Sequence, residues 1–140
     1  MKHFLHYLWT LPQNLLGLLL AWRYERCAQL LCVQRSARFP QVRIVTLDAA
    51  VDFSAISLGH YIIISDSYKD RQRIIRHEEG HCVQSDWLGP LYLLAVGLPS
   101  IVMFLMSGYN RRHGDGRFAD RYYQRWPENQ ADRLGGVIRG

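Results

Sequence analysis

Two histidines and a glutamate stand in a spacing that suits metal chemistry. His77-Glu78-Glu79-Gly80-His81 reads H-E-x-x-H. Residues four apart lie on one face of a helix, so the imidazoles of His77 and His81 can bind the same metal ion. Glu78 lies beside that face, where its carboxylate can take a proton from metal-activated water. The neighbouring Glu79 is expected to point away from the metal and to be dispensable for the chemistry.

A second acidic motif further along the chain can complete the site. Glu128-Asn129-Gln130-Ala131-Asp132 reads E-x-x-A-D and follows Pro127, a residue that suits the first turn of a helix. Catalytic zinc usually has three protein ligands and one open position, so Glu128 is predicted to be the third ligand of one Zn²⁺ ion. Asp132, one turn later, can accept a hydrogen bond from a ligand histidine and fix its tautomer. The same ligands could also hold manganese or cobalt.

Together the two motifs resemble those of the gluzincin zinc metallopeptidases. The Ala-Asp variant is most similar to their membrane-associated branch, which includes the C-a-a-X-type prenyl proteases. The resemblance covers mainly residues 55–82 and 126–136. It implies a minimal zincin domain and a peptide or protein substrate that adds to an edge of the sheet. It also implies endopeptidase cleavage by metal-activated water, with Glu78 as the general base.

The negative charge that develops on a cleaved peptide carbonyl needs a donor from the protein, commonly Tyr, His or Arg in metallopeptidases. The candidates are Tyr122, Tyr123, His113 and Arg139. Two other residues have metal-binding side chains but are predicted to be packing residues. His60 is alone in a strand-like segment, where histidines are more often packed than ligating. Cys82 directly follows the second motif histidine, and helical spacing turns it away from the metal.

Composition limits the class of protein. The 140 residues carry a formal net charge of +5 and are 49% hydrophobic, which fits one domain with a modest core. Arginine supplies nearly all of the positive charge, and a solvated basic face explains it more simply than a nucleic-acid site. Cys27, Cys32 and Cys82 form no disulfide framework, which favours a location in the cytoplasm or at a membrane, facing a reducing compartment.

The N-terminal third, residues 1–38, is predicted to be an apolar and basic helical segment before a catalytic core at residues 39–140. Residues 4–22 are apolar but interrupted at Pro12-Gln13-Asn14, so they fit either a membrane contact or a buried helix. No cleavable signal peptide is expected, because no small-residue cleavage site follows this segment. The basic residues 23–38 are predicted to continue as helix.

Two strand-like runs precede the first motif. Residues 42–47 are rich in β-branched side chains, and residues 55–65 have Gly59-His60 in their middle. They predict a small antiparallel sheet whose last strand leads through Asp66-Ser67 into the metal-binding helix. The predicted fold class is therefore α+β and mostly helical, with this sheet before the metal-binding helix and an apolar helical hairpin after it.

The hairpin is inferred from an apolar run at residues 88–106, which is long enough to cross a bilayer. A single crossing would place Glu128 on the opposite side from the two histidines, so the metal site requires another arrangement. Gly97-Leu98-Pro99 favours a break, since glycine permits a turn and proline restrains the residue before it. Two helical arms at residues 91–96 and 100–106 are predicted, packed in the core or touching a membrane surface.

Three functions from different classes remain open. The first is a zinc-dependent peptidase. The second is a catalytically inactive zincin-like module that binds a partner, against which the retained Glu78 argues, because pure binding needs no general base. The third is a small basic membrane-associated adaptor in which H-E-x-x-H is accidental. The adaptor predicts no stoichiometric metal and binding that weakens with salt.

Overall fold

The computed structural model describes residues 2–27, 29–50, 55–67, 69–114, 117 and 121–139. The fold is α+β, as predicted, with a four-stranded sheet followed by helices. The elements in chain order are α1 (Lys2–Trp9), α2 (Leu11–Arg26), β1 (Leu30–Arg35), β2 (Arg43–Leu47), β3 (Ala55–Leu58), β4 (Tyr61–Ser65), α3 (Arg71–Leu88), η1 (Gly89–Leu91), η2 (Leu93–Gly97), α4 (Leu98–His113), η3 (Tyr122–Gln124) and α6 (Glu128–Gly135).

The sheet is mixed, with the strand order β1-β2-β4-β3. Residues 55–65, predicted as one strand-like run, form two strands, β3 and β4, which pair antiparallel on either side of Gly59-His60, and β1 pairs antiparallel with β2. The central strands β2 and β4 are parallel, so the prediction of a purely antiparallel sheet is wrong for this pair. β4 carries the continuous apolar run Ile62-Ile63-Ile64, which needs cover on both faces and therefore takes an interior place in the sheet.

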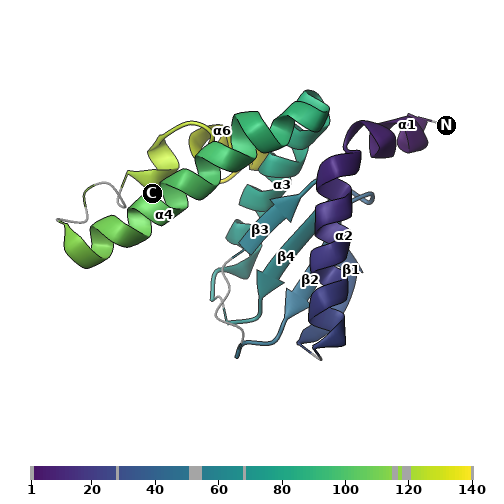
Figure 1. Ribbon diagram of the computed structural model, residues 1–140, viewed down its shortest axis with the longest axis horizontal. Helices are drawn as coiled ribbons and strands as arrows, with labels where there is room; N and C mark the ends of the chain where they lie inside the picture. Colours follow the sequence, from purple (N-terminus) through teal and green to yellow (C-terminus); the bar gives the residue numbers. More distant parts are fainter. Residues whose placement is uncertain are drawn as a thin grey trace.

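Helices cover both faces of the sheet, α2 on one and α3 on the other (Figure 1). The core under α2 holds Ala21, Val45, Leu47, Tyr61 and Ile63, and the core under α3 holds Val42, Ile44, Ile62, Ile64, Ile75 and Cys82. Alternate residues of the central strands therefore point to opposite cores. Cys82 is a core residue, as predicted.

The helix predicted over residues 23–38 is wrong in its second half. α2 ends at Arg26, and residues 30–35 form the edge strand β1. Nearly all of β1 is exposed. Its sequence, Leu-Leu-Cys-Val-Gln-Arg, therefore shows no alternation of apolar and polar residues, which is the pattern that predicts a half-buried strand. The strand forms because its backbone pairs with β2 at Leu30 and, after an irregularity, from Cys32 to Arg35.

The hairpin predicted at residues 91–106 is also wrong. One continuous helix runs over Leu93–His113, and the backbone is helical at both Gly97 and Leu98. Pro99 falls in the first turn of α4, where its missing N–H costs little, after a π-helical turn in η2. The helix projects away from the sheet (Figure 1), and only 11% of its most apolar window is buried.

Candidate metal site

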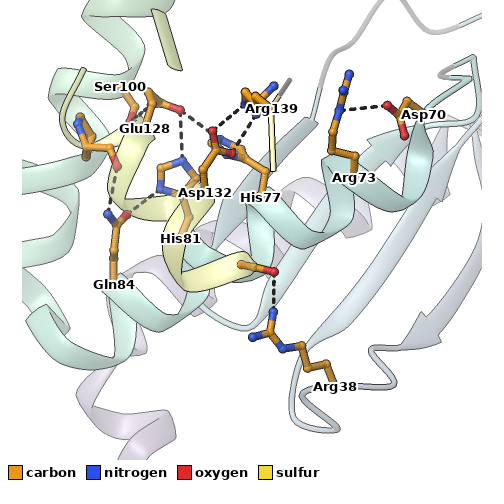
Figure 2. Close-up of polar contacts among 12 residues, drawn as sticks. Arg38, Asp70, Arg73, His77, His81, Gln84, Ser100, Glu128, Asp132 and Arg139 are labelled. Carbon is orange, nitrogen blue, oxygen red and sulfur yellow. Dashed lines mark hydrogen bonds and ion pairs between the residues drawn. The ribbon is translucent and has the colours of Figure 1, made fainter. Parts of the chain in front are cut away.

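The structure brings the three predicted ligands together. His77 and His81 lie on α3, and Glu128 begins α6. All three side chains are buried, and one ligand atom from each lies within 4.8 Å of the others. His77 Nε2 is 3.0 Å and His81 Nε2 is 3.4 Å from the same carboxylate oxygen, Oε2 of Glu128 (Figure 2). Two nitrogens and a carboxylate in one buried group are donors that zinc prefers.

The outer nitrogen of each imidazole has its own acceptor. His77 Nδ1 lies 2.7 Å from Asp132 Oδ1, and His81 Nδ1 lies 2.7 Å from Gln84 Oε1 (Figure 2). The amide nitrogen of Gln84 donates to Pro127 O at 3.1 Å and to Gln130 Oε1 at 2.9 Å, which fixes its oxygen toward His81. These acceptors favour a proton on both Nδ1 atoms, which leaves the Nε2 lone pairs for a cation.

Arg139, one of the predicted oxyanion donors, lies behind Asp132. Its Nε and Nη2 atoms donate to the two oxygens of Asp132 at 2.6 and 2.9 Å. The guanidinium lies 3.3 Å from the centroid of the Tyr123 ring, and that ring packs edge-on against His77 at 5.2 Å. Arg139 and Tyr123 therefore hold the orientation of Asp132 and His77 from two sides.

The other two predicted oxyanion donors, Tyr122 and His113, differ in whether they contact the ligand group. The hydroxyl of Tyr122 forms a hydrogen bond with the Glu128 carboxylate, whose Oε1 also accepts one from Ser100 Oγ at 2.6 Å. His113 is exposed at the end of α4, where its ring packs against Tyr109. It is not among the side chains that converge on Glu128.

Hydrogen bonds across the group outweigh the effect of its burial on ionisation. Burial alone lowers the pKa of His77, but hydrogen bonds with Asp132 and Glu128 raise it to about 9. Burial alone raises the pKa of Glu128, yet its hydrogen bonds with the two histidines hold it well below the ordinary value. A proton and a metal ion therefore compete for the same nitrogen.

The two glutamates of the first motif point in different directions. Glu78 is 7% exposed. Burial is the main cause of the raised pKa of Tyr122 and Tyr123, and the charge of Glu78 adds to it, so Glu78 lies near those side chains. Glu79 points away, as predicted. It accepts a hydrogen bond from Ser36 Oγ and lies 3.9 Å from Arg38, which links α3 to the loop between β1 and β2.

Arg38 also fixes the end of α6. It donates to Gly135 O at 2.6 Å and to Leu134 O at 3.2 Å (Figure 2), where the last carbonyls of a helix lack partners of their own. The sequence suggested only a solvated arginine here.

α3 and α6 run antiparallel and touch backbone to backbone. A Cβ atom on Gly80 would lie 1.9 Å from the carbonyl oxygen of Ala131, and one on Gly135 would lie 1.9 Å from that of Arg76. This approach carries Glu128 to the two histidines. H-E-x-x-H leaves the residue at Gly80 unspecified, so the motif gave no reason for a glycine there. The small residues Ala131 and Gly135, one turn apart, are the signal that could have indicated the contact.

His60 lies apart from the group. Its Nε2 is 3.0 Å from Asp86 Oδ1, and its side chain is buried, so it is a packed and satisfied histidine, as predicted.

Comparison of the chain with protein-family models, curated proteins and solved structures found no match. The site is therefore described from its geometry alone, as a buried His-His-Glu group that could hold a metal ion.

Proposed function

We propose that this chain is a zinc-dependent peptidase of the gluzincin kind that works at a membrane surface. One observation carries the proposal. The Nε2 atoms of His77 and His81 converge on one oxygen of Glu128, while acceptors outside the group hold both Nδ1 atoms. If Glu128 served only to pair with an arginine or with another carboxyl group, the two histidines would not need this orientation.

His77, His81 and Glu128 would hold the ion, and zinc fits this donor set. A divalent ion there supplies Lewis acidity, which polarises a carbonyl and lowers the pKa of water. Glu78 takes the proton of the attacking water and passes it to the leaving amine. Burial raises the pKa of Tyr122 and Tyr123, so both phenols stay protonated. Since Tyr122 is hydrogen-bonded to Glu128, Tyr123 is the phenol that can donate to a developing oxyanion.

The edge strand β3 is the proposed place for a peptide substrate. The outer strands of the sheet are β1 and β3, and β3 packs beside the metal-binding helix α3. An extended peptide can pair with the free backbone groups of such an edge. A peptide paired with β3 would run along α3, so the carbonyl groups of the peptide would lie beside the helix that carries Glu78.

Replacing Glu78 with glutamine tests the peptidase directly. The variant should retain one zinc per chain and lose about 10²–10⁴-fold in cleavage rate, because only the proton transfer is removed. Glu79→Gln is the matched control and should keep both zinc and cleavage. The measurements are metal content and hydrolysis of a quenched-fluorescent peptide library. Zinc binding without cleavage by the wild-type protein would support the inactive binding module instead.

The membrane part of the proposal is supported by a helix whose polar side faces inward. α2 buries Gln13, Asn14, Gly17 and Ala21. Gln13 donates to Ser85 Oγ at 3.0 Å and to Gly89 O at 2.7 Å, and Asn14 Oδ1 accepts from the His60 N–H at 2.7 Å. The opposite side of α2 exposes Leu15, Leu16, Leu18, Leu19 and Trp22. Such an arrangement suits an apolar surrounding better than water.

α4 supports the same surface. Its exposed side chains include Leu98, Ile101, Val102, Phe104, Leu105 and Met106. In Figure 1 α2 lies in front of the sheet and α4 in front of α3, so both helices turn an outer surface to the same side. The exposed Cys27 and Cys32 are free thiols, which supports a reducing compartment on the protein's side of the membrane.

A single crossing of the membrane by α4 does not fit the site. Ser100, in the first turn of α4, donates to Glu128, so the chain must return from His113 to the level of Ser100. That return carries Arg121 and Arg125. The proposed arrangement is therefore an apolar surface that dips into one leaflet.

Flotation with phosphatidylcholine vesicles tests this surface. The double variant Phe104→Lys/Leu105→Lys should bind vesicles at least about tenfold less than wild type, since each lysine opposes insertion. Gln34→Lys/Gln72→Lys, at exposed positions of β1 and α3, adds the same two charges and is the control. Equal flotation of wild type and the double variant would contradict a membrane role for α4.

A further inference from the structure

A cavity of about 530 Å³ lies outside the metal site, at the end of the sheet beside α1. Two arginines, two histidines and two tyrosines contribute to its lining. They are Arg35, Arg43, His6, His60, Tyr7 and Tyr61. No carboxylate is among the described residues that line it. Asp86, which is outside the lining, pairs with His60 at 3.0 Å.

The two arginines are direct partners in the sheet. Arg35 of β1 lies opposite Arg43 of β2, and Arg43 lies beside Tyr61 of β4 in the parallel pair. Side chains directly opposite one another share a face, and like charges in such a pair destabilise a sheet. Among the described residues, both guanidiniums contact neutral groups: Arg35 donates to Pro40 O at 2.7 Å, and Arg43 lies over the Tyr61 ring, 3.4 Å from its hydroxyl.

We propose that this cavity binds a phosphate group. The planar guanidinium presents paired N–H donors that match two phosphate oxygens, so a phosphate between Arg35 and Arg43 would relieve their repulsion and satisfy both. Tyr7, Tyr61 and His6 line the same space, and their side chains carry hydroxyl and imidazole groups that can donate to phosphate oxygens. A phosphate is a better fit than a carboxylate, because it has enough acceptor oxygens for both arginines and the phenols.

The phosphate has two sources that share this chemistry. It can belong to a soluble phosphorylated molecule or to the headgroup of an anionic phospholipid. α1, which supplies His6 and Tyr7, also exposes Phe4, Leu5, Leu8 and Trp9. A lipid headgroup in the cavity would place these apolar side chains against the acyl chains.

Calorimetric titration of the full-length protein with inorganic phosphate and with glycerol phosphate tests the site. Wild type should bind saturably with one site per chain, and Arg35→Gln/Arg43→Gln should weaken the affinity at least about tenfold. Arg111→Gln/Arg112→Gln, on the exposed end of α4, makes the same change in net charge outside the cavity and should leave the affinity unchanged. The absence of saturable binding in wild type, or an equal loss in both double variants, would overturn the proposal.

Thermal unfolding gives a second readout, and its phosphate-free arm does not depend on affinity. In phosphate-free buffer Arg35→Gln should unfold at a higher temperature than wild type, because one of two facing like charges is removed. Phosphate should raise the unfolding temperature of wild type and not that of Arg35→Gln/Arg43→Gln. A lower unfolding temperature for Arg35→Gln in phosphate-free buffer would contradict the proposed repulsion.

Vesicle binding distinguishes the two sources. The assay compares phosphatidylcholine vesicles with vesicles that also contain phosphatidic acid. If the headgroup enters the cavity, the added binding to phosphatidic acid depends on Arg35 and Arg43 and is competed by glycerol phosphate. If a soluble molecule is the ligand, glycerol phosphate still binds at these arginines, and their replacement leaves vesicle binding unchanged.

Discussion

Glu128→Ala is expected to abolish stoichiometric zinc binding. Glu128 is the carboxylate to which both histidine Nε2 atoms point, and its second oxygen is held by Ser100. Two histidines alone hold zinc far more weakly than three ligands do, so metal content should fall from one ion per chain to a small fraction under the same dialysis. Zinc should raise the unfolding temperature of wild type and leave that of the variant unchanged.

The control for Glu128→Ala is Glu25→Ala, which removes an exposed carboxylate from α2. It should bind zinc as wild type does. If Glu128→Ala also kept one zinc per chain, Glu128 would not be a ligand, and the peptidase proposal would lose its third coordination position. If neither wild type nor the two variants bound metal, the adaptor function would replace the peptidase proposal.

Gly80→Ala is expected to disrupt the same site without touching a ligand. The added methyl would lie 1.9 Å from Ala131 O and 2.6 Å from its carbonyl carbon, and these are backbone atoms that cannot turn aside. α6 must shift away from α3, which separates Glu128 from the histidines. Overpacking of this kind costs about 1–3 kcal/mol in the free energy of unfolding, and more when backbone must move. Zinc affinity should fall by at least about tenfold.

Gly108→Ala provides a matched control, since it makes the same substitution within a helix. A Cβ at Gly108 meets no atom within 4 Å, so this variant should gain about 0.5–1 kcal/mol from the helix propensity of alanine. Chemical denaturation and competition with a zinc chelator measure both effects. Equal stability of the two variants would mean that α3 and α6 are not in backbone contact in solution.

Much of the fold follows from local patterns in the sequence. The β-branched run at residues 42–47 and the apolar run before Asp66 predicted strands ahead of the metal-binding helix, and Pro127 and Gly136 mark the two ends of α6. Gly136 has a φ of 70°, a left-handed conformation that glycine adopts without a side-chain clash. The spacing of His77 and His81 on a helix and the E-x-x-A-D motif predicted the group that the structure brings together.

The features that were not predicted depend on contacts between distant parts of the chain. β1 is a strand because β2 is beside it, although its own side chains are mostly exposed. The parallel pairing of β2 with β4 depends on which strand takes the interior position. The residues that hold the ligands and their helices in place depend on distant partners. Gln84, three residues from His81, is fixed by Pro127, Ser100 donates to Glu128, and Arg38 donates to Gly135. No periodicity within one helix or strand reveals such pairs.

The backbone contact between α3 and α6 also defines a search pattern. Gly80 must be glycine at its close approach to Ala131, and Gly135 must be glycine at its approach to Arg76. A chain that assembles the same pair of helices should therefore carry H-E-x-G-H and, after an apolar segment of variable length, E-x-x-A-D-x-x-G. This combined pattern is far rarer by chance than H-E-x-x-H alone, because it fixes five further residues, three of them small. Scanning genomes with it would identify distant relatives of this chain whose overall sequences have diverged beyond ordinary alignment.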